Sequence, residues 1–285
     1  MGSIYNDNSR ISDKILKFFI YLCAAFSVLV LLSIIVTVVI RGLPSINLEF
    51  LTDTQSTLRG TFGILGNLIN TLYIIVITLL IVTPIGVGGA IYLNEYANGG
   101  KLVNAIQFTI ETLAGIPSII FGLFGMVIFG EFLGLGYSIL TGALTLSLMI
   151  LPIISSSTQV ALKEVPESYR QGAIGIGATK WYMIRTIILP SALPGIITGI
   201  VLGIGRIVGE SAALLFTAGS SYLLPRNVFS HMFNSGGTLT IQLYLSMTNA
   251  KYDQAFGIAL VLIVLVFILN RLTHYISSRF NKEKG

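Results

Sequence analysis

Residues 169–190 read YRQGAIGIGATKWYMIRTIILP, a polar and net positive segment, punctuated by glycine, between two long apolar runs. The segment is longer than the chain needs to turn between two adjacent spans. In a strongly hydrophobic protein, a connection of this length and polarity indicates a surface that contacts a partner in the aqueous phase. The apolar runs on either side of it determine the fold class.

Composition places the chain in a membrane. Hydrophobic residues make up 54% of the 285 residues and charged residues 10%, and the mean hydropathy is +0.86. A water-soluble fold of this composition would have too few polar groups for its surface. Crossing a hydrocarbon layer of about 30 Å takes about 20 helical residues. The sequence therefore predicts an all-α membrane protein with six transmembrane helices, near 15–40, 67–93, 105–129, 138–161, 192–218 and 254–277.

Lysine and arginine set the orientation. If both termini are cytoplasmic, twelve of these residues lie in inner segments and only four lie in outer loops. This positive-inside bias places the N- and C-termini and residues 163–190 in the cytoplasm. Anionic lipid headgroups account for the net charge of +5, so nucleic acid is not required as a partner. The four outer residues are Arg41, Arg59, Arg226 and Lys251.

Motifs for covalent chemistry are absent from the sequence. It contains no G-x-x-x-x-G-K-[ST] phosphate loop, no H-E-x-x-H and no G-x-S-x-G. Cys23, the only cysteine, lies in the first span, so the chain cannot build a disulfide or a thiolate metal cluster. His231 and His274 are expected to be solvated or interfacial. We therefore predict no catalytic residue, no metal site and no cofactor bound by this chain, and any ATP is expected on another chain.

The polar segment carries signals for two short helices. Pro166 favours the first turn of a helix because its missing N–H would have no partner there. Gly175 and Gly177 weaken that helix, and Thr179 can cap a second one. We expect this second helix to stop before Pro190. The residues alone fit a docking loop and an amphipathic segment on the membrane surface equally well.

The spacing of the segment resembles the cytoplasmic EAA loop of ABC importer permeases. That loop has the pattern Glu-Ala-Ala, three residues, Gly, nine residues, Ile, one residue, Leu-Pro. Here Gln171-Gly172-Ala173, Gly177, Ile187 and Leu189-Pro190 take these places, with Gln and Gly where the family usually has Glu and Ala. The resemblance implies a coupling helix that docks into an ATPase subunit, so that closure of the ATPase around ATP moves the membrane helices. The residues it assigns to ATPase coupling are Tyr169, Arg170, Gln171, Gly172, Ala173, Gly177 and Ala178.

A narrower resemblance rests on the segments FLTDTQS, NLINTLYIIVITLLIVTPIGVGGAIYLNEYA, ETLAGIPSIIFGLFG and LPSALPGIITGIVLGIGRIVGESAALLFTAG, which together run from Phe50 to Gly219. They resemble the A-type permease subunit of bacterial phosphate-specific ABC importers. This implies a type I ABC importer permease fold in a prokaryotic cell membrane, with residues 1–285 as one domain and residues 163–190 as its coupling loop. It also implies a second, C-type permease, two ATP-binding subunits that hold ATP and Mg²⁺, and an extracytoplasmic phosphate-binding protein. The C-type partner permease and permeases for molybdate or sulfate are the related alternatives.

The predicted fifth span presents glycines and charges on one face. At about 100° per residue, five residues fall within a quarter of the circumference: Gly195, Gly199, Gly203, Arg206 and Glu210. The glycines allow another helix to approach closely, and Arg206 and Glu210, at i and i+4, can form an ion pair. If the span enters the hydrocarbon near Gly195, Arg206 lies about 16 Å further along, near the middle of the membrane.

Two roles are open for this pair: it either braces helices or belongs to a substrate pathway. We favour the pathway because insertion scales assign a central arginine a cost of about 2.5–3.5 kcal/mol, and charges kept there tend to be functional. A guanidinium offers a planar fork of donors that matches phosphate oxygens. By competing for Arg206, Glu210 would keep the affinity low enough for release.

The predicted third span has a similar face, formed by Glu111, Gly115, Ser118 and Gly122. We include Glu111 and Ser118 among the pathway candidates, although a solvated carboxylate near a helix N-terminus fits Glu111 equally well. Together the predictions describe a permease that performs no covalent chemistry and moves phosphate by alternating access with a second permease. An ion-coupled secondary transporter is the rival class, and the coupling-loop motif argues against it.

Overall fold

The computed structural model describes residues 11–56, 61–97, 99–225 and 227–282. Helices dominate this part of the chain, and its one sheet is an antiparallel hairpin of β1 (Thr54–Ser56) and β2 (Thr61–Ile64). The 3₁₀ turn η1 covers Leu43–Ser45, and π-helical turns cover η2 (Tyr92–Tyr96), η3 (Met126–Phe132) and η4 (Ile184–Ile188). The α-helices are α1 (Ile11–Gly42), α2 (Leu48–Thr52), α3 (Leu65–Ile91), α4 (Lys101–Gly115), α5 (Ser118–Gly125), α6 (Ile139–Glu164), α7 (Glu167–Gly175), α8 (Lys180–Met183), α9 (Leu189–Val208), α10 (Ala212–Thr217), α11 (Val228–His231), α12 (Leu239–Thr248) and α13 (Tyr252–Lys282).

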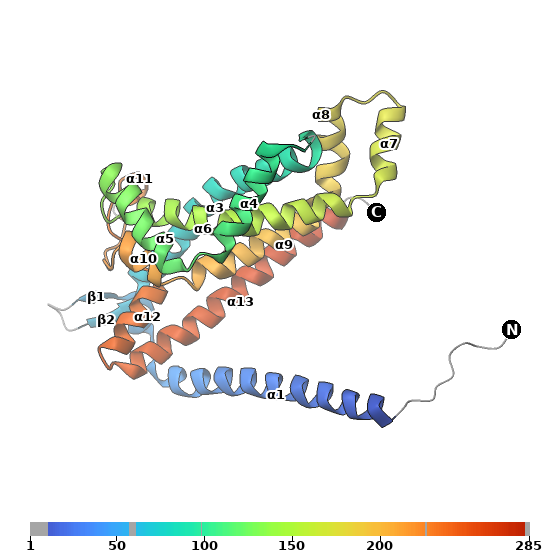
Figure 1. Ribbon diagram of the computed structural model, residues 1–285. Helices are drawn as coiled ribbons and strands as arrows, with labels where there is room; N and C mark the ends of the chain where they lie inside the picture. The colour runs from blue at the N-terminus through green and yellow to red at the C-terminus, as the bar shows by residue number, and fades with distance from the viewer. Residues whose placement is uncertain (1–10, 57–60, 98, 226, 283–285) are drawn as a thin grey trace.

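The long helices α3, α6, α9 and α13 run side by side, whereas α1 extends away from them (Figure 1). The hairpin and α11 lie at one end, and α7 and α8 lie at the other. The C-terminal turns of α13 lie at the same end as α7 and α8. At the opposite end α1 meets α13, where the guanidinium of Arg41 lies 5.2 Å from the ring centre of Phe256.

The spans agree in number with the sequence prediction. By length and apolar composition, five described helical segments can each cross a membrane, and a bent pair of helices makes a sixth span when it is counted as one. The single segments are Asp13–Ser45, Leu65–Tyr96, Ile139–Glu164, Lys180–Val208 and Tyr252–Thr273, and the bent pair is Lys101–Gly115 with Ser118–Phe132.

The third span is broken, so the prediction of one straight helix over residues 105–129 is wrong. The two halves meet at 107°, and Ile116 between them has an extended backbone with ψ 131°. Pro117 accounts for the break, because it donates no hydrogen bond and disfavours the helical conformation of the residue before it. Consequently Glu111 and Ser118 do not lie on one continuous helix face.

The fifth span also differs from its predicted bounds. It begins at Lys180 and ends at Val208, and residues beyond it form the separate helix α10. The π turn η4 joins α8 directly to α9, so the expectation that the helix stops before Pro190 is wrong. A π turn adds one residue to the helical turn, which lets the chain pass a proline that has no N–H to donate.

Helix α6 forms the centre of the bundle. Its side chains Leu146, Ile150 and Ile154 are fully buried, and α3 and α9 pack along it. The glycines of α9 make one of these contacts possible, because a Cβ added at Gly195 would lie 2.5 Å from the Cβ of Ala161. Apolar side chains at such positions would push the two helices apart.

Candidate translocation and coupling sites

The helix is interrupted between α9 and α10 at residues 209–211, and the charge pair lies at this break. Gly209 closes α9 by donating its N–H to the carbonyl of Gly205 at 3.1 Å. The carboxylate of Glu210 then caps α10, since its Oε1 accepts from the N–H of Ala213 at 3.0 Å. The carbonyl of Glu210 accepts from Oγ1 of Thr240 at 2.9 Å. Glu210 is therefore fixed by contacts to two helices.

Arg206 occupies the last turn of α9 and is held far less tightly. Its Nη2 lies 3.6 Å from Oε2 of Glu210, and its side chain is 51% exposed, whereas that of Glu210 is 5% exposed. An ion pair at this distance is a weak contact compared with a charge-assisted hydrogen bond of about 2.7–2.9 Å. Arg206 can thus leave Glu210 without disturbing the packed part of the break.

The packing of α9 on α6 gives the depth of this pair. Going along α9, added Cβ atoms at Gly195, Gly199 and Gly203 would meet Ala161, Ser157 and Ile150 in turn, so the two helices run antiparallel. Ile150 lies near the middle of α6 (Ile139–Glu164), and Arg206 is about one turn beyond Gly203. Arg206 therefore lies about one turn beyond the middle of α6, toward its outer end, in the last turn of the helix that ends at Val208.

The outer half of the broken third span packs against the start of α10. A Cβ added at Gly122 of α5 would lie 2.8 Å from Cα of Ala213, at the start of α10. Ser118 is half-buried one turn before Gly122, whereas Glu111 is exposed on α4, beyond the 107° bend. Among the described residues, no hydrogen bond or ion pair joins either of them to Arg206 or Glu210. Of the four predicted pathway residues, the geometry therefore brings together only Arg206 and Glu210.

The predicted coupling loop folds as two short helices joined by a turn at Gly177. This glycine has φ +79°, a left-handed conformation that side chains disfavour. Thr179 caps α8, because its Oγ1 accepts from the N–H of Tyr182 at 3.4 Å. Tyr169, Gln171 and Gly172 are exposed on the outside of the loop, and Ala173 and the half-buried Ala178 face its interior.

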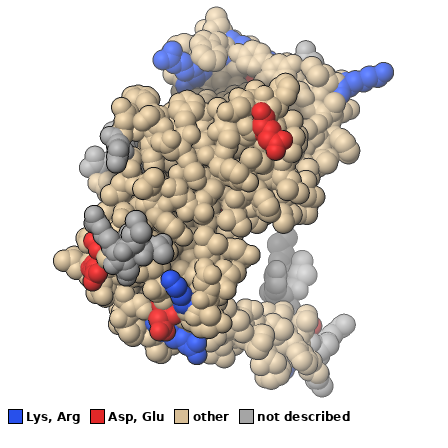
Figure 2. Space-filling view, turned by 90° about the vertical axis from the view of Figure 1, so that its left-hand side faces the viewer, with Lys and Arg blue, Asp and Glu red and all other residues tan. Residues whose placement is uncertain are grey.

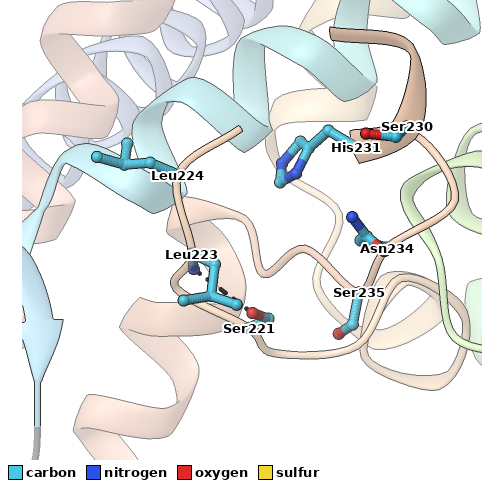
Figure 3. A pocket seen from close by; sticks show the side chains of 7 residues that line it. All are labelled: Ser221, Leu223, Leu224, Ser230, His231, Asn234 and Ser235. Carbon is cyan, nitrogen blue, oxygen red and sulfur yellow. Dashed lines mark hydrogen bonds between the residues drawn. The ribbon is translucent and has the colours of Figure 1, made fainter. Parts of the chain in front are cut away.

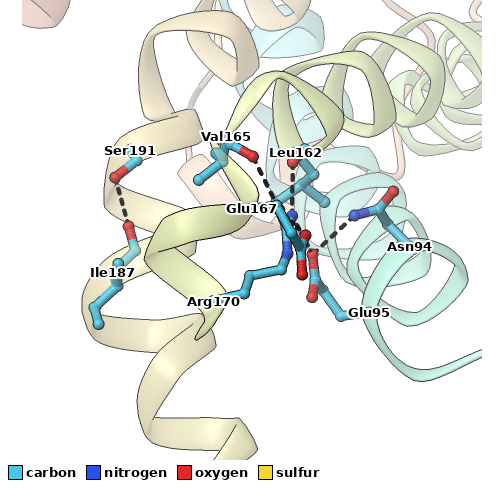
Figure 4. A network of polar contacts seen from close by, with 8 residues as sticks. All are labelled: Asn94, Glu95, Leu162, Val165, Glu167, Arg170, Ile187 and Ser191. Atoms are coloured by element: carbon cyan, nitrogen blue, oxygen red, sulfur yellow. Dashed lines mark hydrogen bonds and ion pairs between the residues drawn. The ribbon is translucent and has the colours of Figure 1, made fainter. Parts of the chain in front are cut away.

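Arg170 points inward from the loop and not toward the water (Figure 4). Its Nη2 donates to Oε1 of Glu95 and to the carbonyl of Leu162, both at 2.9 Å. Its Nη1 donates to the carbonyl of Val165 at 2.9 Å and lies 3.4 Å from the exposed carboxylate of Glu167. The bond to Glu95 raises the pKa of Arg170, although burial opposes the rise. Sequence reasoning missed Glu95, whose partner lies 75 positions further along the chain.

The opposite end of the bundle holds a cavity of about 590 Å³, lined by serines, His231, Asn234 and two leucines (Figure 3). His231 lines it but is only 3% exposed, so the expectation of a solvated histidine is wrong. Its Nε2 lies 2.7 Å from Oδ1 of Asn70 in α3, and burial lowers the pKa of His231. The side chain of His274 lies outside the described residues. Viewed from this end, the surface carries few charged side chains (Figure 2).

Solved structures with the same architecture define the class. An alginate ABC transporter, crystallised with its alginate pentasaccharide-bound periplasmic protein, matches with a TM-score of 0.71 and 17% identity, over 95% of this chain and 96% of that chain. An inward-facing MetNI methionine ABC transporter matches with a TM-score of 0.57 and 22% identity, over 76% of this chain and 94% of that chain. The fold is that of a type I ABC importer permease.

The family follows from sequence. The model of the binding-protein-dependent transport system inner membrane component matches residues 83–282, and the chain belongs to this family of multi-pass membrane permeases. A probable ABC transporter permease protein, YqgI of Bacillus subtilis, is 34% identical over 97% of this chain and 98% of its own. The phosphate transport system permease protein PstA of Mycobacterium leprae is 32% identical over 92% of this chain and 87% of its own. The phosphate transport system permease protein PstC of Mesorhizobium japonicum is 29% identical over 92% of this chain and 89% of its own.

Proposed function

We propose that this chain is a permease subunit of an ATP-driven importer of inorganic phosphate. The observation that carries the proposal is the break between α9 and α10, where a half-exposed arginine faces a buried and anchored glutamate. Non-helical backbone inside a membrane is tolerated where it lies within protein or lines a pathway. Relatives named as phosphate transport permeases support the choice of phosphate.

The difference between Arg206 and Glu210 supplies the mechanism. Glu210 is held by the N–H of Ala213 and by Thr240, so it stays in place when an anion arrives. Arg206 can swing from Glu210 to the phosphate, because its guanidinium matches two phosphate oxygens. When phosphate moves on, Glu210 recaptures the guanidinium. Competition of this kind keeps the bound state short, as transport requires.

The partners follow from the same proposal. A second, C-type permease would face this chain across the pathway, and the two would alternate between outward and inward access. Two ATP-binding subunits would bind ATP and Mg²⁺ and seat the loop of residues 163–190, and an extracytoplasmic protein would deliver phosphate. This chain would contribute one permease domain, residues 1–285, and would bind no cofactor itself.

Another oxyanion is the alternative substrate. Sulfate and molybdate carry oxygens that the same guanidinium can bind, so the site geometry does not choose between them and phosphate. The test is uptake of labelled phosphate into proteoliposomes that hold the four-subunit complex and its binding protein. Competition by excess unlabelled phosphate alone would support the proposal. Displacement by sulfate or molybdate at equal concentration would assign the other substrate.

A further inference from the structure

The coupling loop is tied to α3 by polar contacts that cross 75 positions of sequence. Glu95 lies in η2, at the inner end of the second span, and its side chain is 5% exposed; that of Arg170 is 14% exposed. A second contact lies beside it, since Nζ of Lys180 lies 5.0 Å from the ring centre of Tyr96. Thus both helices of the loop contact the last residues of the second span.

Arg170 also binds the end of α6. The carbonyls of Leu162 and Val165 belong to the last turn and cap of that helix, where backbone acceptors have no helical donor. A cation at a helix C-terminus is further favoured by the helix dipole. One guanidinium therefore joins α3, α6 and α7 at a single point.

The link to α3 differs from the link to α6. Helix α7 follows α6 directly in the chain, so any movement of the loop reaches α6 through covalent bonds. Helix α3 has no such connection to the loop. Val87 and Ile91 of α3 pack against the apolar side of the loop region, but apolar contacts are not directional and permit sliding. The ion pair between Arg170 and Glu95 fixes the position of α7 relative to the inner end of the second span.

The far end of α3 holds the outer segment before α12. The amide of Asn70 donates to the carbonyl of Gly237 at 3.3 Å, and that of Asn67 donates to the carbonyl of Thr238 at 3.1 Å. The N–H of Leu239 donates to Oγ1 of Thr71 at 2.9 Å. A displacement of α3 at its inner end would therefore also displace the outer segment 237–239.

We propose that Glu95 is a positioning residue. Its ion pair with Arg170 makes the coupling loop and α3 move as one body, so that movement of the ATPase reaches the outer segment 237–239 through α3. The inference rests on the proposed function in one respect, namely that an ATPase subunit binds the coupling loop. It does not depend on which anion is carried. Arg170 then acts through α3, while exposed residues of the loop contact the ATPase. The exposed Glu167 contributes little, because it is solvated and 3.4 Å from the guanidinium.

The first measurement is a distance. Because Cys23 is the only cysteine, a Cys23→Ser background accepts spin labels at Ile85 of α3 and Ile174 of α7, both of which are exposed. In the full complex, the distance between the labels should be equal in nucleotide-free and vanadate-trapped states. In Glu95→Gln it should change between the two states. A change in the unmutated background, or no change in Glu95→Gln, overturns the proposal.

The second measurement is phosphate moved per ATP hydrolysed. We expect Glu95→Gln to lower this ratio about fivefold or more, as for loss of a coupling energy of typical size, while basal ATP hydrolysis per assembled complex persists. Glu95→Asp should recover part of the loss, and Glu167→Gln, the matched control on the same guanidinium, should equal the wild type. An unchanged ratio in Glu95→Gln contradicts the proposal. So does failure of both Glu95 variants to assemble, because the pair would then serve folding and not transmission.

The two proposals fail separately. If the unmutated complex moves no phosphate, the proposed substrate is wrong, whereas the label distance still decides whether loop and α3 move together. If phosphate is moved but Glu95→Gln behaves as the wild type in both measurements, only the positioning role is wrong.

Discussion

The chain holds two arginine–glutamate pairs that differ in how tightly they are closed. At the inner end, Arg170 and Glu95 are both largely buried and lie 2.9 Å apart, and Arg170 also donates to two helix carbonyls. At the outer end of α9, Arg206 is half exposed and lies 3.6 Å from Glu210. In the first pair both terminal nitrogens of the arginine are in use, so it cannot exchange partners without loss. The second leaves its arginine free to take another anion.

This difference separates a mechanical role from a transport role. Breaking a closed, buried pair leaves a charge without a partner and lowers stability. Breaking an open pair costs little stability but removes whatever the free partner binds. Variants of the inner pair should therefore lower stability, whereas variants of the Arg206–Glu210 pair should lower transport.

Arg170→Met is expected to have the largest effect. It removes the partner of Glu95 and two carbonyl contacts, and loss of one member of a buried pair costs about 3–5 kcal/mol. The yield of assembled complex and the midpoint of thermal unfolding in detergent should both fall. An unfolding midpoint equal to that of the wild type would show that the inner pair is not structural.

Arg206→Lys should reduce transport without reducing assembly. Lysine keeps the charge but not the planar fork, and charge-assisted hydrogen bonds are worth about 1.5–3 kcal/mol, so uptake should fall by about ten- to a hundredfold. Uptake per assembled complex in vesicles measures this, with the unfolding midpoint as control. Wild-type uptake by the lysine variant would remove Arg206 from the pathway.

Gly177→Val tests the shape of the coupling loop. A Cβ would meet no atom within 4 Å, so the strain comes from φ +79° alone. A left-handed conformation costs a side chain about 1–2 kcal/mol, so stimulated ATP hydrolysis and uptake should fall together, with insertion unchanged. Gly172→Ala is the matched control, because Gly172 is exposed in a helix with free space around it. Equal activity of Gly177→Val and the control would rule out the bend.

Gln171→Glu should have the smallest effect. Gln171 is exposed on α7, and glutamate restores the residue that is usual in EAA loops. Transport should stay within about twofold of the wild type, as is typical of surface substitutions. Loss of uptake in this variant would mean that the ATPase surface requires a neutral side chain here.

Local signals explain what the sequence predicted well. Hydropathy marks the spans because a membrane crossing needs a fixed length of apolar helix. Pro166, Gly177 and Thr179 mark the two short helices because capping and turn preferences act within a few residues. The number of spans, the helix after Pro166 and the cap at Thr179 appear in the structure as predicted, whereas the bounds of the third and fifth spans do not.

Tertiary contacts explain the errors. Pro84, Pro152 and Pro194 lie inside continuous helices, whereas Pro117 breaks one. The residue type is the same, so packing against other helices decides the outcome, and a single sequence does not contain that packing. The π turn before Pro190 was hidden for the same reason.

Long-range pairing explains the missed residues. Glu95 gave one available signal, an acidic residue at the inner end of an apolar span facing a cytoplasmic arginine, but its partner is distant in sequence. His231 is buried and forms a hydrogen bond with Asn70, 161 positions away. Local patterns can identify such a residue as unusual, but they cannot say which partner it meets.

The central claim is that Arg206 alternates between Glu210 and phosphate, and Glu210→Gln tests it most directly. The substitution removes the competing charge, and the amide can still accept from the N–H of Ala213. The measurement is phosphate residence on the complex together with uptake per assembled complex. The account predicts longer residence and slower uptake with unchanged assembly. Unchanged residence and uptake, or a fall in complex yield before any change in transport, would contradict it.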